Sequence, residues 1–228
     1  MPYASSSLNN PDLPPVPSPQ ADRLSRHPGS TGQTSAGMRT RLAADLVSLA
    51  ERFPALHRPD RWEWASITMR FSTAIPVDDL VSSTHVVGFV DDLVLLCRDD
   101  REDVWFLPGG TREPGESVED SLARELLEEA GARLLSDFHP IGAHVGRSDA
   151  AQPYRPHLPH PDKAWLWGWA DVEVVGPPSN PEDGEVISEV AAVPVLEAAR
   201  RAVTDAPWAG ELILLAAEQR EAARPPGR

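Results

Sequence analysis

The sequence predicts a mixed fold of the α/β or α+β class, in which a few helices cover a sheet. Segments with the two-residue alternation of strands are interspersed with segments of helical spacing. The 228 residues, 41% of them hydrophobic, can build a core without disulfides, and the single cysteine, Cys97, falls in an apolar run. We expect the main domain over residues 59–224, a helix and linker over 38–58, and a disordered Pro- and Ser-rich tail over 1–37.

The net charge of the chain limits the classes of molecule that it can bind. The chain carries 35 Asp and Glu against 21 Lys and Arg, a formal net charge of -14. Such a chain binds nucleic acid or an anionic membrane poorly, so we expect neither as a partner. It has no apolar run near the ~18 residues of a spanning helix and no signal-peptide layout at its start. We therefore expect a cytoplasmic protein that acts on a small molecule. If that molecule is a phosphate compound, a cation or a local Arg cluster must offset the repulsion.

The first half of the chain is expected to form one helix and then strands. Leu42 and Leu46 have helical spacing, which predicts a helix over residues 38–53 that Pro54 ends. Further along, Pro108-Gly109-Gly110 breaks the strand pattern. The strands predicted from alternation and β-favouring residues are 62–71, 85–90, 93–98 and 104–107, with a turn at Asp91 and Asp92 joining the middle two.

The second half is expected to alternate strands, loops and helices. Trp165, Trp167 and Trp169 share one face of a predicted strand, where they serve either as core or as a stacking surface for a base. The loops 148–162 and 176–184 are polar or rich in His and Pro. The remaining predicted elements are strands near 133–145, 164–175 and 185–193 and helices over 196–203 and 209–222, with Pro194 suited to a first helical position.

The most informative stretch is a helix predicted over residues 117–130. Ser117 with Asp120 is an N-terminal capping pattern, and Gly131 is the expected residue just past the end. Apolar residues expected on one face are Ala123, Leu126, Leu127 and Ala130. Acidic residues three or four positions apart, and therefore on a second face, are Glu125, Glu128 and Glu129.

Clustered carboxylates on a helix need an explanation. Each close pair of like charges costs roughly 0.2–0.5 kcal/mol in water, and the dipole near the C-terminal end adds to the repulsion. The simplest alternative is a solvated acidic face without a function. A bound hard cation resolves the repulsion better, because Mg²⁺ and Mn²⁺ prefer oxygen ligands. Glu116 can reach the same region, and Arg124 can hold a carboxylate in place through paired hydrogen bonds.

The stretch resembles the Nudix box, the pattern G-x5-E-x7-R-E-U-x-E-E-x-G-U in which U is apolar. The residues that fill its fixed positions are Gly110, Glu116, Arg124, Glu125, Leu126, Glu128, Glu129, Gly131 and Ala132. This resemblance implies a Nudix-type αβα sandwich with a mixed sheet. It also implies hydrolysis, dependent on Mg²⁺ or Mn²⁺, of a pyrophosphate bond in a nucleoside diphosphate linked to another group.

The resemblance also implies roles for individual residues. The equivalents of Glu125, Glu128 and Glu129 bind metal in that family, a backbone carbonyl at the Gly110 position can add a ligand, and the equivalent of Arg124 orients a glutamate. A glutamate takes the proton of the attacking water. The sequence leaves this base open between Glu125 and a set of later acidic residues: Glu182, Asp183, Glu185 and Glu189.

The substrate is less well determined, because the tags of the substrate subfamilies do not match outside the box. Arg147 and Arg155 are candidates for contact with phosphate, and Trp105 is a candidate for stacking on a base. His157 and His160 are either ligands or plain loop residues.

Two rivals to the general interpretation remain: a sanitising hydrolase for oxidised nucleoside triphosphates, and a nucleotide-sensing module without turnover. The helix over 38–53 or the C-terminal helix could also form a homodimer contact.

Overall fold

The computed structural model describes residues 49–99, 103–179, 186–203 and 206–224. The predictions for the tail 1–37 and for residues 38–48 lie outside these ranges. Residues 49–52 are helical and this helix ends before Pro54, as predicted. Pro54 then occupies the first turn of a second, short helix, α2 (Pro54–His57). None of the helices in the described ranges has the length and apolarity needed to cross a membrane.

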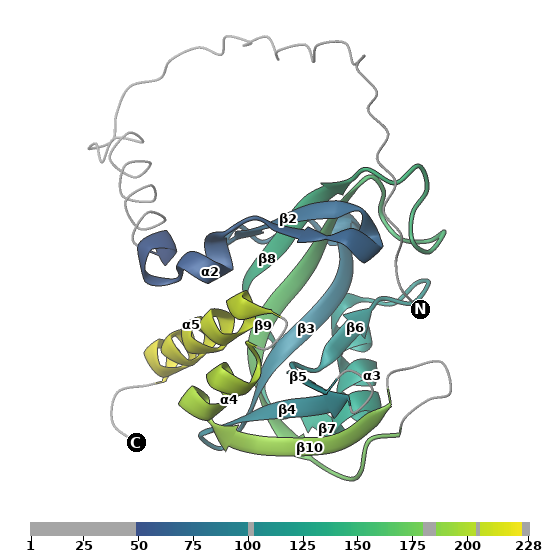
Figure 1. Ribbon diagram of the computed structural model, residues 1–228. Helices are drawn as coiled ribbons and strands as arrows, with labels where there is room; N and C mark the ends of the chain where they lie inside the picture. Colours follow the sequence, from purple (N-terminus) through teal and green to yellow (C-terminus); the bar gives the residue numbers. More distant parts are fainter. Residues whose placement is uncertain (1–48, 100–102, 180–185, 204–205, 225–228) are drawn as a thin grey trace, which may run out of the picture. The chain divides into compact units, whose positions relative to one another are not determined.

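The strands of the described residues join into one mixed sheet, drawn in Figure 1. Its main path runs β1-β2-β8-β9-β3-β4-β10, with β5, β6 and β7 paired at its sides. The two central strands, β3 and β9, are parallel, and the other pairs are antiparallel. The bounds are β1 Asp60–Trp62, β2 Ile67–Ser72, β3 Val81–Val90, β4 Leu93–Asp99, β5 Val104–Phe106, β6 Gly109–Thr111, β7 Ala132–Leu134, β8 His139–Ser148, β9 Asp162–Val174 and β10 Ile187–Pro194.

Helices cover both faces of this sheet. Successive residues of β3 point to opposite faces: Val86 packs in a cluster with Leu126 of α3 (Val118–Ala130), whereas Val87 packs in a cluster with Leu212 of α5 (Pro207–Ala223). The short helix α4 (Val195–Arg201) packs beside α5. Figure 1 shows α3 on one side of β3 and β9, and α4 with α5 on the other. This arrangement confirms the predicted αβα sandwich with a mixed sheet.

Most of the predicted elements are confirmed. The hairpin of β3 and β4 turns at Asp91 and Asp92. Cys97 is fully buried, as expected of a small core residue. The predicted strand 164–175 and the two C-terminal helices correspond to β9, α4 and α5.

Three strand predictions differ from the structure. The strand predicted over 62–71 is a hairpin of β1 and β2, because a turn of 3₁₀ helix, η1 (Glu63–Ala65), and Ser66 with a φ of 47° reverse the chain. The strand predicted near 133–145 is two strands, β7 and β8, which both pair with β9. The predicted break at 108–110 carries β6, in which Gly109 pairs with His85 of β3.

The predicted apolar face of α3 was partly wrong. Ala123 and Leu127 are exposed, whereas Leu126 and Ala130 are buried as expected. The inner face is completed by polar residues, among them Glu125 and Glu129, with 9% and 5% of their surface exposed. Burial of these two carboxylates is tolerable because each accepts hydrogen bonds from neighbouring groups.

Candidate active site

Helix α3 has well-defined ends. The Ser117 hydroxyl accepts a hydrogen bond from the Asp120 amide at 3.0 Å, which satisfies a free donor of the first turn. At the other end Gly131 has a φ of 56° and its amide donates to the Leu127 carbonyl. These caps confirm the predicted helix and fix which side chains point toward the Gly109-Gly110 turn.

Arg124 lies at the centre of three carboxylates. Its Nε donates to Glu116 Oε1 at 2.7 Å, and its Nη1 donates to Glu125 Oε1 at 2.9 Å and Glu128 Oε2 at 3.1 Å. Its Nη2 donates to Glu116 Oε2 and to the Thr111 carbonyl, both at 3.1 Å. The hydrogen bonds between Arg124 and Glu116 lower the pKa of Glu116 and raise the pKa of Arg124. This cluster, Glu116, Arg124, Glu125 and Glu128, is called the acidic cluster below.

Glu129 and the two glycines complete the arrangement. Glu129 Oε2 accepts a hydrogen bond from the Gly109 amide at 2.9 Å. Gly110 lies so close to Glu125 that an added Cβ would stand 2.3 Å from Glu125 Oε1. The Gly110 carbonyl accepts a hydrogen bond from the Ser83 hydroxyl at 2.7 Å. The Gly109-Gly110 turn therefore lies directly against the acids of α3.

The donor atoms gathered here suit a hard divalent cation. The side chains of Glu116, Glu125, Glu128 and Glu129 and the Gly110 carbonyl all offer oxygen, the ligand that Mg²⁺ and Mn²⁺ prefer. Among the described residues, no group of three or more His, Cys, Asp or Glu side chains is arranged by itself around a metal position. Glu116, Glu125 and Glu128 instead share the guanidinium of Arg124. The chemistry of these oxygen donors fits the predicted metal.

One of the predicted phosphate-binding residues lies beside this cluster. Arg155 Nη1 donates to Glu113 Oε1 at 2.8 Å, and the Glu113 amide donates to Glu116 Oε2 at 2.8 Å. His157, in the same loop, has its Nε2 2.8 Å from the Arg112 carbonyl, which accepts a hydrogen bond. The loop between β8 and β9 is thereby joined to the turn that precedes α3.

The other predicted substrate residues have different neighbours. Arg147 pairs with Asp162 at 2.9 Å, and the ring of Trp105 lies under Arg201 and packs against the core of the α5 side. His160 is exposed in the loop. Trp167 and Trp169 are core residues, whereas Trp165 is only partly buried.

The candidates for the general base separate into three groups. Glu125 belongs to the acidic cluster. Glu189 is exposed on β10 and lies 3.8 Å from Arg98. Glu182, Asp183 and Glu185 lie outside the described residues.

Ser83 and His85 are polar residues near the site that the sequence reasoning did not single out. His85 Nε2 lies 2.7 Å from the Ser83 hydroxyl, and its ring stacks on Trp167 with centroids 4.5 Å apart. Burial lowers the pKa of His85 to about 3, so the ring is neutral near pH 7. The available signal was two polar residues on the same face of a strand otherwise rich in valine.

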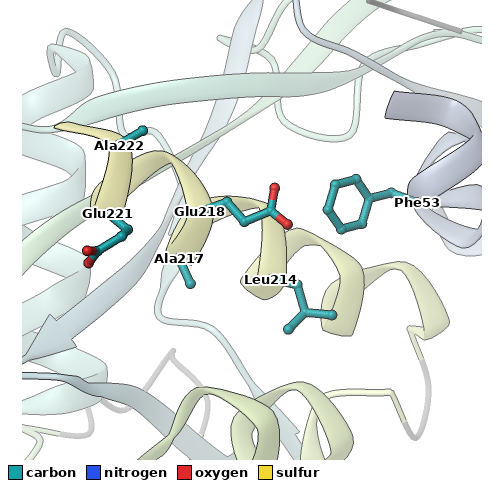
Figure 2. Close-up of a pocket in the computed structure, with 6 residues that line it drawn as sticks. All are labelled: Phe53, Leu214, Ala217, Glu218, Glu221 and Ala222. Atoms are coloured by element: carbon teal, nitrogen blue, oxygen red, sulfur yellow. The ribbon is translucent and has the colours of Figure 1, made fainter. Parts of the chain in front are cut away.

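A pocket of about 620 Å³ lies between Phe53 and α5. Figure 2 shows Glu218 of α5 extending toward the ring of Phe53. The lining residues are Phe53, Leu214, Ala217, Glu218, Glu221 and Ala222, and none of the predicted site residues is among them. Its two walls come from the segments predicted to contribute to a homodimer contact, which stays a prediction.

Comparison with known proteins assigns the family. Residues 80–215 match the model of the NUDIX domain, so the chain belongs to the Nudix family. It is 45% identical over 53 residues to the uncharacterized Nudix hydrolase YvcI of Bacillus subtilis (strain 168), covering 23% of this chain and 34% of that protein. It is 48% identical over 50 residues to the nucleoside triphosphatase NudI of Escherichia fergusonii, covering 20% of this chain and 36% of that protein. The matches thus span about a third of these two relatives.

A solved structure supports the fold. The chain resembles a crystallised mutant of the Bacillus subtilis pyrophosphohydrolase BsRppH with a TM-score of 0.51 and 18% sequence identity, over 73% of this chain and 98% of that one. Together with the family match, this confirms the predicted Nudix-type sandwich. Strands β1 and β2 precede residue 80 and lie outside the family match.

Proposed function

We propose that this chain hydrolyses a phosphoanhydride bond in a nucleotide or nucleotide derivative, with a divalent metal ion as cofactor. The observation that carries the proposal is the convergence of Glu116, Glu125 and Glu128 on Arg124 at 2.7 to 3.1 Å. Three carboxylates held together by one arginine form a preorganised set of oxygen donors. Membership of the Nudix family makes hydrolysis the reaction class that fits such a set.

The residues that would hold the metal, Mg²⁺ or Mn²⁺, are Glu116, Glu125, Glu128 and Glu129 and the carbonyl of Gly110. When bound, the ion neutralises the charge of a pyrophosphate and favours ionisation of a water. Arg124 positions the acids of the cluster, because its planar guanidinium bonds to several of them at once. Ser83 fixes the direction of the Gly110 carbonyl.

A carboxylate must take a proton from the attacking water. Among the candidates in the described residues, Glu125 lies in the acidic cluster and Glu189 pairs with Arg98. We therefore propose Glu125 as the base. Parallel Glu→Gln variants at Glu182, Glu185 and Glu189, with Asp183→Asn, test the alternatives through the acidic limb of the pH–rate profile.

The substrate is proposed as a nucleoside triphosphate or a nucleoside diphosphate derivative. The name of the NudI relative, a nucleoside triphosphatase, favours the first of these. A sanitising role predicts strong preference for 8-oxo-dGTP over dGTP, and equal turnover of the two would exclude it.

The full chain should be assayed for release of phosphate, pyrophosphate or nucleoside monophosphate from a nucleotide panel, with Mg²⁺, Mn²⁺ or EDTA. We expect turnover that EDTA abolishes, and a fall of about 100-fold or more in kcat for Glu129→Gln. The exposed Glu119 of α3 provides the matched control, Glu119→Gln, which should keep wild-type turnover. Nucleotide binding by calorimetry without any product would overturn catalysis and indicate a sensing module.

A further inference from the structure

Four aromatic side chains from β1, η1, the loop between β8 and β9, and β9 form a group, and two of them are exposed. Trp64 in η1 and Tyr154 in the loop between β8 and β9 are 53% and 61% exposed, although they are large. Their rings meet edge to face at 5.7 Å, and Trp62 and Trp165 lie 6.4 Å and 5.7 Å from the Trp64 ring. These four residues, Trp62, Trp64, Tyr154 and Trp165, are called the aromatic platform below.

Two rings of the platform are anchored in the core, and the other two are exposed. Trp62 is parallel to Trp64 within 13° and only 4.3 Å from Trp165, and both Trp62 and Trp165 pack against the core. Trp62 and Trp165 therefore hold Trp64 in place, while half of its surface faces solvent. A rigid aromatic ring held in this way offers a planar ligand a stacking surface at little entropic cost.

Two sets of contacts connect the platform to the acidic cluster. Tyr154 is followed by Arg155, which pairs with Glu113 of the turn before α3. From the other side, Trp165 lies 5.1 Å from His85, which is bonded to Ser83 and through it to the Gly110 carbonyl. The platform is thus fixed relative to the residues proposed to act on the phosphates.

We propose that the aromatic platform binds the nucleobase of the substrate, with the base stacked on Trp64 and bordered by Tyr154. This inference rests on the proposed function. Arg155 is partly exposed, lies over the Tyr154 ring and pairs with Glu113 of the turn before α3, so a guanidinium lies beside the platform. Trp62 and Trp64 lie before residue 80, so the β1–β2 hairpin, which is outside the family match, supplies two of the four rings, whereas Tyr154 and Trp165 lie inside the match.

The chemistry of the platform favours a nucleobase over a protein partner. The exposed surface is a pair of rings with a cation beside them, which suits a flat ring that carries phosphate. A stable protein interface needs an area on the order of 800 Å² per partner, far more than two exposed side chains provide. The test below nevertheless includes an outcome that would reveal a protein partner.

The test compares Trp64→Ala, Trp64→Phe and a control, Leu196→Ala, an exposed apolar residue of α4. Binding of GMP and AMP is measured by calorimetry, and kcat and KM are measured on the best nucleotide of the panel. Inorganic pyrophosphate serves as the ligand without a base. We expect Trp64→Ala to raise Kd and KM about 5- to 150-fold, the range of one base–aromatic stack.

The other arms separate stacking from a structural effect. Trp64→Phe should recover most of the affinity, Leu196→Ala should match wild type, and the Kd of pyrophosphate should not change in Trp64→Ala. Unchanged Kd and KM in Trp64→Ala would overturn the proposal, as would equal losses for pyrophosphate and GMP. Dimerisation that Trp64→Ala abolishes, with nucleotide binding intact, would assign the platform to a second copy of the chain.

Failure of this inference can be distinguished from failure of the proposed function. If wild type turns over a nucleotide and Trp64→Ala has an unaltered KM, the base-binding role of the platform is refuted and the hydrolase function stands. If GMP binding depends on Trp64 and no nucleotide is turned over, the hydrolase function is refuted and the base-binding role of the platform stands.

Discussion

Replacing Gly110 by alanine should impair catalysis far more than stability. The new Cβ would stand 2.3 Å from Glu125 Oε1, 2.5 Å from its carboxylate carbon and 2.8 Å from Oε2. Ordinary van der Waals contact begins near 3.4 Å, so the carboxylate must retreat by about 1 Å. Gly110 is not in the left-handed region, unlike Gly109, and its backbone therefore accepts an alanine.

The expected magnitudes follow from what has to move. A displacement of about 1 Å in a catalytic group can cost on the order of 100-fold in rate, or about 2.7 kcal/mol of transition-state stabilisation. The fold loses only part of the hydrogen bond from Arg124 to Glu125, about 1 kcal/mol, and so roughly 3 °C in Tm. The carboxylate lies at the flexible end of a side chain, and so the backbone need not shift.

Gly131→Ala provides the contrast. Gly131 has a φ of 56°, and a Cβ there would stand 2.1 Å from the backbone oxygen of Gly176. This change should lower the free energy of unfolding by about 3 kcal/mol or more, through left-handed strain and a forced backbone shift.

The assay measures kcat on the best substrate and Tm by calorimetry for wild type and both variants. Full activity in a folded Gly110→Ala protein would refute the placement of Glu125 against Gly110 as a requirement for catalysis. A large loss of Tm in that variant would instead make Gly110 a structural residue.

Three further predictions address other parts of the molecule. Arg124→Lys keeps the charge but cannot bond several carboxylates at once, so kcat should fall about 10- to 100-fold. The control Arg133→Lys changes an exposed ion pair and should leave kcat unchanged. Equal kcat values for the two variants would contradict the positioning role of Arg124. Burial lowers the pKa of His144 to about 3 from 6.5, so below pH 6.5 the unfolded chain takes up a proton that the folded chain does not, and the free energy of unfolding falls. Between pH 7.5 and 5.5, the free energy of unfolding measured in urea should therefore fall by about 1.4 kcal/mol less for His144→Phe than for wild type. The same fall in both proteins would contradict the lowered pKa. Ser117→Ala removes the cap of α3 and should lower the free energy of unfolding by about 1 kcal/mol, whereas an unchanged Tm would show that the cap is dispensable.

Local signals in the sequence predicted the centre of the site well. The cap at Ser117, the glycine at 131 and the spacing of the glutamates depend only on neighbouring residues, and the structure confirms the helix they define. The box pattern likewise predicted the family, which the match over residues 80–215 confirms. The roles of the individual acids stay predictions.

The errors arose where tertiary contacts decide. Hydrophobicity placed Leu127 on the buried face of α3, where it is exposed, and the acidic spacing did not show that Glu129 is buried. A sequence pattern cannot reveal that the Gly109 amide will pair with Glu129. Alternation over 62–71 gave no warning that Ser66 would adopt a left-handed conformation and reverse the chain. The contact of Arg155 with Glu113 joins residues 42 positions apart, and such pairings are set by the sheet rather than by local sequence.

Binding of Mn²⁺ tests the central claim, that the acidic cluster is a divalent-cation site. Calorimetric titration should compare wild type with Glu128→Gln and with Glu119→Gln, an exposed acid on the same helix. We predict saturable Mn²⁺ binding that Glu128→Gln weakens about 10-fold or more and that Glu119→Gln leaves unchanged. Equal affinities for all three proteins would contradict the account.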